Sequence, residues 1–376
     1  MKLKKALLVC LIPAFVISGC GKTTTDEAEN TMKQETTAEE SAQDEQEMES
    51  TEAETSGEDA DEEAEVSKDL FAMDTYMTLT AYGEHAQEAV DKAAERVEEL
   101  DALLSTGDEN SEIYQLNQSG EATLSEEGGY LVERALELYQ KTDGAFDIAI
   151  YPVMQAWGFP TQEYHVPDDA TLKEKLALAD ASKVNYDKDT RKISFDQDGM
   201  EIDLGGIAKG YTSSQIMQIY QDCGVTSGLV NLGGNVQALG CKTDGSKWRV
   251  AIQSPDDTED YLGILEIENQ AVITSGGYER YFEEDGVTYH HIIDPATGYP
   301  ADSGLISVTI VSDDGTLADG LSTSLFIMGE EKAAQFWREN SDEFETIMET
   351  SDGKLYVTEG ITDSLTTDMD VTVIEK

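Results

Sequence analysis

Residues 201–211 of this 376-residue chain read EIDLGGIAKGY, and this stretch predicts a junction between a strand and a helix. A short strand ending near Asp203 leads into a turn at Gly205 and Gly206, and a helix follows with Lys209 in its first turn. Unpaired N–H groups at a helix start, together with a lysine, bind anions such as phosphate. The spacing matches neither the Walker loop nor the GxGxxG dinucleotide fingerprint. Taken alone, the stretch favours a tight turn with a surface lysine over a phosphate site.

The elements on either side of this junction do not alternate regularly between strand and helix. Runs of β-forming residues predict strands at 71–82, 229–231, 248–252, 262–267, 287–293 and 306–311. Apolar residues at helical spacing predict helices at 86–104, 130–139, 172–178, 207–220 and 318–328. We find no second linker and no internal repeat, so residues 68–376 are expected to form one folded body. The predicted class is α+β, with a mixed, largely antiparallel sheet and flanking helices.

The first 67 residues differ from the rest of the chain. Three lysines precede an apolar run from Ala6 to Ile17, and Ser18, Gly19 and Cys20 close it. This pattern resembles a bacterial lipoprotein signal peptide over residues 1–19, with Cys20 as the lipidated residue; an ordinary signal peptide with an incidental cysteine is the alternative. Residues 20–67 are acidic and almost free of large apolar side chains, so we expect a disordered tether. The protein is therefore expected outside the cytoplasm, anchored to the bacterial cell membrane by a lipid such as palmitate.

The charge balance excludes one class of function. The chain has 78 acidic and 25 basic residues, for a formal net charge of −53. A nucleic-acid binder needs clustered Lys and Arg to neutralise phosphates, so we expect no nucleic-acid partner. An anionic ligand would need a metal ion or a few well-placed basic residues to offset this charge.

A second stretch, LADGLSTSLF at 317–326, carries oxygen ligands on a predicted helix. Asp319 and Thr323 are four residues apart and share one helix face, with Ser322 beside them. One carboxylate and two hydroxyls form a hard, oxygen-only set that suits Mg²⁺. Asp319 in the first turn of a helix, complementing the helix dipole, is the simpler alternative.

Two of the four histidines, His290 and His291, are adjacent at the end of a predicted strand. Neighbours on a strand face opposite ways, so at most one of them points into a site, where it could accept a proton from a hydroxyl. A zinc site is not expected, because the other histidines lie in unrelated contexts and no thiols cluster. Cys223 and Cys241 could form a disulfide or remain free thiols, and their spacing does not decide.

Six motifs in order resemble the ApbE family of flavin transferases. They are GAFD (144–147), DLGGIAKGY (203–211), NLGGNV (231–236), SGGYER (275–280), HIIDPATGYP (291–300) and ADGLSTSLF (318–326). Each glycine motif alone is equally well explained as a turn or as a close approach of the backbone to a flat ligand. The ordered set covers the chain from about Phe71 to Gly329 and is far more specific than any single motif.

The resemblance implies a Mg²⁺-dependent FAD:protein FMN transferase. FAD would be cleaved at its pyrophosphate, AMP would leave, and FMN would be esterified to a Thr or Ser hydroxyl of an exported acceptor protein. Two alternatives stay open: a metal-dependent FAD pyrophosphatase, in which water replaces the acceptor hydroxyl, and a non-catalytic FAD-binding lipoprotein.

The resemblance also implies roles for individual residues. Asp319, Ser322, Thr323 and the backbone carbonyl of Gly206 would hold the metal, and Lys209 would face the phosphates from the opposite side. His291 is the candidate base. The expected FAD contacts are Met73, Ala145, Phe146, Asp147, Asp203, Lys209 and Ile293. The chain departs from the family pattern at Gly107, where an aromatic residue is usual, so another aromatic residue such as Tyr114 would have to stack on the ligand.

Overall fold

A nine-stranded sheet with the order β1-β2-β6-β7-β10-β13-β14-β15-β17 organises the computed structural model, which describes residues 64–255, 257 and 260–376. The strands of the described residues are β1 Glu65–Ala72, β2 Thr75–Tyr82, β3 Glu121–Thr123, β4 Val184–Asp187, β5 Lys192–Phe195, β6 Gly228–Leu232, β7 Asn235–Leu239, β8 Trp248–Gln253, β9 Tyr261–Ile267, β10 Ala271–Gly276, β11 Tyr281–Glu284, β12 Val287–His290, β13 Leu305–Ser312, β14 Glu345–Thr350, β15 Leu355–Thr358, β16 Leu365–Thr366 and β17 Val371–Ile374. The helices are α1 Ala86–Leu104, α2 Glu112–Ser119, α3 Glu126–Lys141, α4 Tyr151–Ala156, α5 Asp169–Leu176, α6 Gly205–Asp222, α7 Gly315–Met328 and α8 Glu330–Glu339, with short 3-10 turns η1 Ile148–Ile150, η2 Ala181–Lys183 and η3 Glu359–Ile361.

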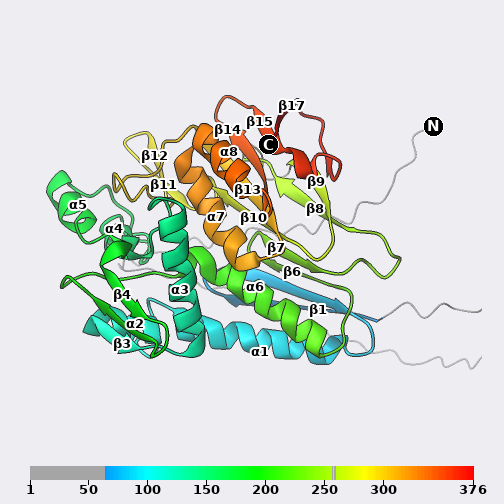
Figure 1. The fold of residues 1–376 in the computed structure, drawn as a ribbon, viewed down its shortest axis with the longest axis horizontal. Helices are drawn as coiled ribbons and strands as arrows, with labels where there is room; N and C mark the ends of the chain where they lie inside the picture. The colour runs from blue at the N-terminus through cyan, green and yellow to red at the C-terminus, as the bar shows by residue number, and fades with distance from the viewer. Residues whose placement is uncertain (1–63, 256, 258–259) are drawn as a thin grey trace, which may run out of the picture. The chain divides into compact units, whose positions relative to one another are not determined.

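Within the main sheet, neighbouring strands pair antiparallel except for β15 and β17, which are parallel. Helices α1, α6 and α7 cover one face of this sheet (Figure 1). The small sheet β16-β9-β8 covers part of the other face, where Trp248 and Leu265 pack with Val272 and Val311. This is the mixed, largely antiparallel α+β fold that the sequence predicts.

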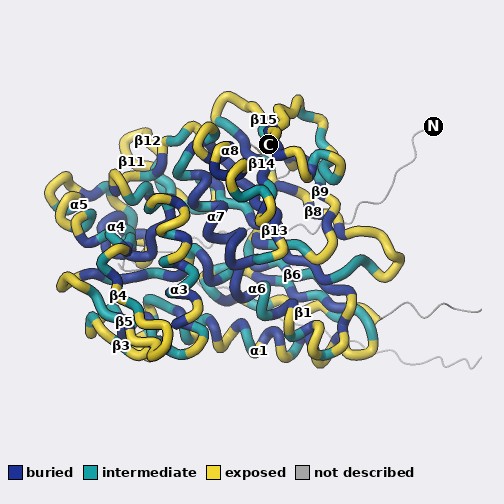
Figure 2. The backbone as a smooth tube through the Cα atoms, viewed as in Figure 1, coloured by how far each residue is buried: buried dark blue, intermediate teal, exposed yellow. Residues whose placement is uncertain are grey.

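Helix α7 lies in the middle of the core. Nearly every residue from Gly315 to Phe326 is buried, which explains why its sequence shows no polar face (Figure 2). It packs closely against α6, because a Cβ atom at Gly210 would lie only 2.1 Å from the carbonyl oxygen of Gly315. The two helices that carry the site motifs therefore touch backbone to backbone.

The N-terminal part of the body differs from the prediction in two ways. The predicted strand at 71–82 is a hairpin of β1 and β2, turned by Met73 and Asp74 with φ angles of 49° and 59°. The sequence lacks the Asn-Gly or Asp-Gly signal of such turns, so the break was not predicted. The body also starts at Glu65 rather than Lys68, because Glu65, Val66 and Ser67 already pair with β2. The predicted signal peptide (1–19), Cys20 and most of the tether lie outside the described residues.

The starts of the two site helices also need correction. No ladder forms at 201–203, where the backbone is extended but bonds to the side chain of Asn117 and to the carbonyl of Ile148. Helix α6 starts at Gly205 and α7 at Gly315, so Lys209 and Asp319 lie in the second turn of their helices, not the first. The N-cap of α7 is Asp314, whose carboxylate accepts the Leu317 N–H at 3.1 Å.

The described residues show whether Cys223 and Cys241 form a disulfide. Cys223 and Cys241 are both free thiols. Among the helices of the described part of the chain, none combines the length and the apolar character that a membrane span requires.

Candidate active site

Asp319 on α7 is a buried carboxylate at the crossing with α6. Its side chain is 6% exposed. Its Oδ2 accepts the Gly210 N–H at 2.8 Å, and its Oδ1 accepts a hydrogen bond from the Asn235 amide at 3.0 Å. Burial raises the pKa of Asp319, whereas the charge of Lys209 and the hydrogen bonds from Gly210 and Asn235 counteract the rise. The predicted residues Asp319 and Lys209 are thus brought together, although their sequence positions are far apart.

A second carboxylate, Glu279, belongs to the same charge cluster and was not among the predicted site residues. Burial raises its pKa to about 7, the charge of Asp319 raises it further and that of Lys209 lowers it. Among the described residues, Lys209 makes no ion pair within 4 Å. Its positive charge nevertheless lowers the pKa of both Glu279 and Asp319. A cation in this position can approach an anionic ligand. Glu279 lies in the quoted motif SGGYER, but nothing in that motif alone indicates its proximity to Lys209.

Hydroxyl groups gather one helical turn beyond Asp319. The Ser275 hydroxyl at the end of β10 lies 2.8 Å from the Ser322 hydroxyl and 3.3 Å from the Thr323 hydroxyl. Ser322 also donates to the backbone carbonyl of Asp319 at 2.8 Å. The structure therefore confirms that Ser322 and Thr323 lie together, and it adds Ser275, which the sequence did not single out.

The donor set around Asp319 fits a hard cation. The Gly210 N–H that binds Asp319 is the group that a regular helix would direct to the carbonyl of Gly206, four residues earlier. The carboxylate competes for this donor, so the Gly206 carbonyl has acceptor capacity to offer. Within the described residues no three His, Cys, Asp or Glu side chains cluster as metal ligands. A metal here would depend on one carboxylate with hydroxyl and carbonyl oxygens, a set that suits Mg²⁺ rather than zinc.

His291 follows β12 and belongs to this site. Its Nδ1 lies 3.2 Å from the Arg280 carbonyl, which can only accept, so Nδ1 carries the proton and Nε2 has a free lone pair. Burial lowers the pKa of His291 to about 4, and the positive charges of Arg280 and Lys209 contribute. A neutral imidazole with a free Nε2 can accept a proton at neutral pH. The neighbouring His290 instead packs edge-on against Phe326 of α7 and contacts the Ala301 carbonyl.

Asp203 lies at the N-terminal end of α6, and Met73 contacts this helix about two turns further on, at Thr212. The sulfur of Met73, at the tip of the β1–β2 hairpin, is 3.7 Å from the Thr212 hydroxyl. Asp203 accepts the Gly205 N–H at 2.8 Å at the start of α6. Burial raises the pKa of Asp203, and the charge of Arg280 counteracts this. The structure therefore places Asp203 at the start of α6 and Met73 beside the middle of the same helix.

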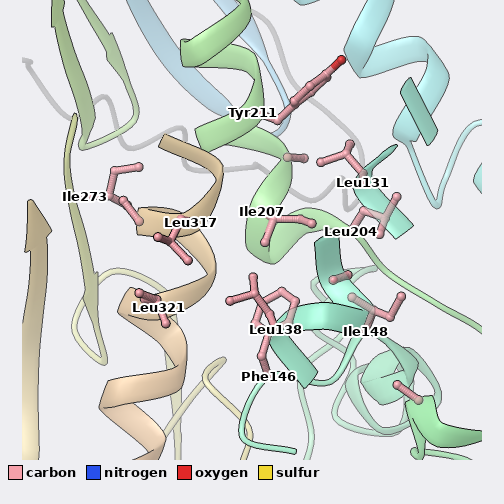
Figure 3. Packing of buried hydrophobic residues seen from close by; sticks show 14 of the residues in the cluster. Leu131, Leu138, Phe146, Ile148, Leu204, Ile207, Tyr211, Ile273, Leu317 and Leu321 are labelled. Atoms are coloured by element: carbon pink, nitrogen blue, oxygen red, sulfur yellow. The ribbon is translucent and has the colours of Figure 1, made fainter. Parts of the chain in front are cut away.

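Most of the other residues predicted to contact FAD make hydrogen bonds or packing contacts within the protein. The carboxylate of Asp147 accepts the N–H groups of Ala149 and Ala181 at 2.7 and 3.2 Å, and burial raises its pKa to about 6. The ring of Phe146 is buried beside Leu138 and Ile207, under the α6–α7 crossing (Figure 3). Ile293 is buried in a separate small cluster around Trp157. Ala145 is partly exposed, in contrast to the buried Phe146 and Asp147.

An aromatic ring does lie beside the loop that contains Gly107. The hydroxyl of Tyr151 bonds to the side chain of Thr106 and is influenced by the charge of Asp203. Tyr151 is therefore an aromatic residue that the structure connects to both this loop and Asp203, and stacking of Tyr114 on the ligand stays a prediction.

Comparisons with known proteins identify the family of this chain. The model of the ApbE family matches residues 73–348. A protein named FAD:protein FMN transferase from Klebsiella pneumoniae is 35% identical over 262 residues, which cover 69% of this chain and 81% of that protein. One of the same name from Treponema pallidum is 34% identical and covers 73% of this chain and 82% of its own length.

Solved structures of ApbE proteins have a fold similar to that of this chain. The ApbE protein of Thermotoga maritima aligns with a TM-score of 0.76 at 29% identity, over 80% of this chain and 99% of that one. The flavin transferase ApbE of Vibrio cholerae aligns with a TM-score of 0.73 over the same shares, also at 29% identity. The chain is an enzyme and belongs to the ApbE family.

Proposed function

We propose that this protein is a Mg²⁺-dependent FAD:protein FMN transferase. In the reaction, a Thr or Ser hydroxyl of an acceptor protein attacks the phosphorus on the FMN side of FAD. The bond from that phosphorus to the bridging oxygen breaks, AMP leaves, and the hydroxyl proton passes to a base. The products are AMP and an acceptor that carries FMN in a phosphoester bond.

The observation that carries this proposal is the immobilised carboxylate of Asp319 beside the unpaired cation of Lys209. A pyrophosphate brings negative charge into a chain with a formal net charge of −53, so its binding requires local positive charge. A bound Mg²⁺ would neutralise the two phosphates and polarise the reacting phosphorus. Asp319, Thr323, Ser322 and the Gly206 carbonyl would hold that ion. Lys209 would bind the phosphates, with the N–H groups of the α6 start as further donors.

His291 is the residue that we assign to the proton transfer. The bond from its Nδ1 to the Arg280 carbonyl fixes the tautomer, and its lowered pKa keeps the ring neutral at pH 7. The charge of Lys209 also lowers the pKa of His291, which supports our assignment of both residues to the same ligand. The acceptor hydroxyl would donate its proton to Nε2 as it attacks.

Two other functions use part of the same site. A pyrophosphatase would release free FMN, because water would take the place of the acceptor hydroxyl. A storage protein would bind FAD without cleaving it, but storage does not require a metal-binding carboxylate beside a phosphate-binding lysine. The names of the relatives favour transfer over both.

The experiment is to incubate the protein with FAD, Mg²⁺ and an exported protein that contains an FMN-binding domain. We expect flavin fluorescence on the acceptor band in a denaturing gel and one AMP for each FMN attached. Free FMN with an unlabelled acceptor would establish the pyrophosphatase instead. FAD that stays intact with Mg²⁺ and acceptor present would contradict both enzymatic proposals.

We also propose that the chain is exported and anchored by a lipid on Cys20, with the acidic residues that follow as a tether. The support is the basic start, the short apolar run and the small residues before Cys20. The Cys20→Ala variant should stay unprocessed or leave the membrane fraction, and normal anchoring of this variant would contradict the proposal. A chain starting at residue 64 should transfer FMN as fast as the chain starting at residue 21.

A further inference from the structure

We propose that Asn235 is a positioning residue that orients the carboxylate of Asp319 for binding a divalent cation. This inference rests on the proposed function, because it concerns the same metal site. Asn235 lies in the motif NLGGNV, which the sequence leaves open as either a turn or an approach to a flat ligand.

The contact between the two residues is buried and leaves room for a cation. Asn235 is 2% exposed, and its Nδ2 donates to Oδ1 of Asp319 at 3.0 Å. The Gly210 N–H donates to Oδ2 at 2.8 Å. An ionised carboxylate offers about four lone-pair positions. With the Asn235 amide on one oxygen and the Gly210 N–H on the other, the carboxylate cannot rotate freely, and these two donors do not use all of its lone-pair positions.

The backbone around Asn235 explains how this donor is held in place. Asn235 is the first residue of β7 and pairs with Leu232 across a two-residue turn. Gly233 and Gly234 form this turn with φ angles of 65° and 96°, and Gly234 donates its N–H to the side chain of Asn231 at 2.8 Å. Turns of this kind fix the register of a hairpin. The amide of Asn235 is therefore delivered to Asp319 by the main sheet, not by either of the two site helices.

The site needs such a donor because Asp319 is buried. A buried carboxylate loses its hydration and needs hydrogen-bond donors in its place, and Asn235 supplies one of them. The amide also occupies one side of the carboxylate, which prevents Asp319 from turning away from the hydroxyls of Ser322 and Thr323.

The test measures Mg²⁺ binding without FAD, through the rise in melting temperature with Mg²⁺ concentration. The variant Asn235→Leu keeps the side-chain size and removes the donor, and Asn235→Ala removes both. Loss of a residue that orients a metal ligand typically weakens metal binding about 10- to 100-fold. We expect a shift of that size in the Mg²⁺ midpoint, and an equal shift in the Mg²⁺ dependence of FAD cleavage.

Asn231→Ala is the matched control, because it removes an asparagine from the same hairpin that contacts the turn and not Asp319. It should lower the melting temperature and leave the Mg²⁺ midpoint unchanged. An unchanged midpoint in a folded Asn235 variant would overturn the inference. Failure of both Asn235 variants to fold, while Asn231→Ala folds, would also overturn it by assigning Asn235 to stability. A wild-type protein that shows no response to Mg²⁺ would instead contradict the proposed function.

Discussion

Asp319 and His291, which we propose to act in one site, are held by different kinds of structure. Asp319 lies where α6 and α7 cross, under the main sheet, and two buried donors hold its carboxylate. His291 follows the two-stranded sheet β11-β12, which is separate from the main sheet. That hairpin is attached by aromatic contacts: the ring centroid of Phe282 lies 5.4 Å from that of Tyr164, and the ring centroid of Tyr289 lies 5.3 Å from that of Trp157.

This difference between the helix crossing and the hairpin corresponds to two requirements of the proposed reaction. Charge neutralisation requires oxygen ligands at fixed positions, and a closely packed helix crossing supplies them. Proton transfer requires contact with a hydroxyl of another protein, and a hairpin with exposed residues such as Tyr281 and Val287 lies at the surface. Changes near the crossing should therefore affect metal binding and stability, whereas changes near the hairpin should affect transfer alone.

The largest effect is expected for His291→Ala. Removing the base should lower the rate of FMN transfer by about 10²- to 10⁴-fold, the usual contribution of general base catalysis. The Mg²⁺ midpoint of thermal stabilisation should stay at the wild-type value, because His291 is not a metal ligand. Rapid transfer by the folded variant would show that another group takes the proton.

Gly210→Ala should destabilise the protein at the crossing of α6 and α7. The added Cβ would lie 2.1 Å from the Gly315 carbonyl oxygen and 2.6 Å from the Cβ of Asp319. Overpacking of this kind typically costs about 1–3 kcal/mol, measured by chemical denaturation. Gly107→Ala is the control, because the nearest atom to its added Cβ is the Ser105 hydroxyl at 3.8 Å. Equal stability of the two variants would contradict the tight helix crossing.

Tyr164→Ala should loosen the hairpin without disturbing the crossing. A stacked aromatic pair contributes about 0.5–1.5 kcal/mol beyond its buried area, so transfer should fall by no more than about tenfold. The control is Tyr281→Ala on the same hairpin, whose side chain is 49% exposed. An altered Mg²⁺ midpoint in Tyr164→Ala would show that the two halves of the site are coupled.

The smallest effect on FMN transfer is expected from the titration of His291 between pH 6 and 8. Because the pKa of His291 is lowered to about 4, its ring should stay neutral across this range and add no step near pH 6.5, whereas Glu279, whose pKa is raised to about 7, titrates there. The same shift affects stability, since the unfolded chain binds the proton more tightly. The contribution of this group to the free energy of unfolding is complete above about pH 6.5 and is lost as the pH falls towards 4. A step at pH 6.5 that persists in the Glu279→Gln variant would contradict the buried, neutral ring of His291.

The sequence predicted those features that depend on local patterns. Helix α1 was predicted with its bounds because its apolar residues repeat at helical spacing and all face the core. Residues Asp319, Ser322 and Thr323 share a short helical segment, so their proximity follows from helix geometry. The α+β class followed from the irregular order of strands and helices.

The features that escaped prediction depend on contacts between distant segments. Asn235 and Asp319 are 84 positions apart, and only the packing of β7 against the helices joins them. Glu279 approaches Lys209 through the fold, and no spacing in the sequence marks it. The turn at Met73 and Asp74 uses positive φ angles without glycine, which the local sequence does not indicate.

The most direct test of the central claim is the Mg²⁺ dependence of FMN transfer in Asp319→Asn. This change keeps the shape of the side chain and removes its charge. Asp314→Asn on the same helix is the control, because asparagine caps a helix about as well as aspartate. We expect transfer by Asp319→Asn to fall by about two to three orders of magnitude with its Mg²⁺ response lost, while Asp314→Asn stays near wild type. Near wild-type transfer by a folded Asp319→Asn variant, with an unchanged Mg²⁺ requirement, would place the metal elsewhere and contradict the account.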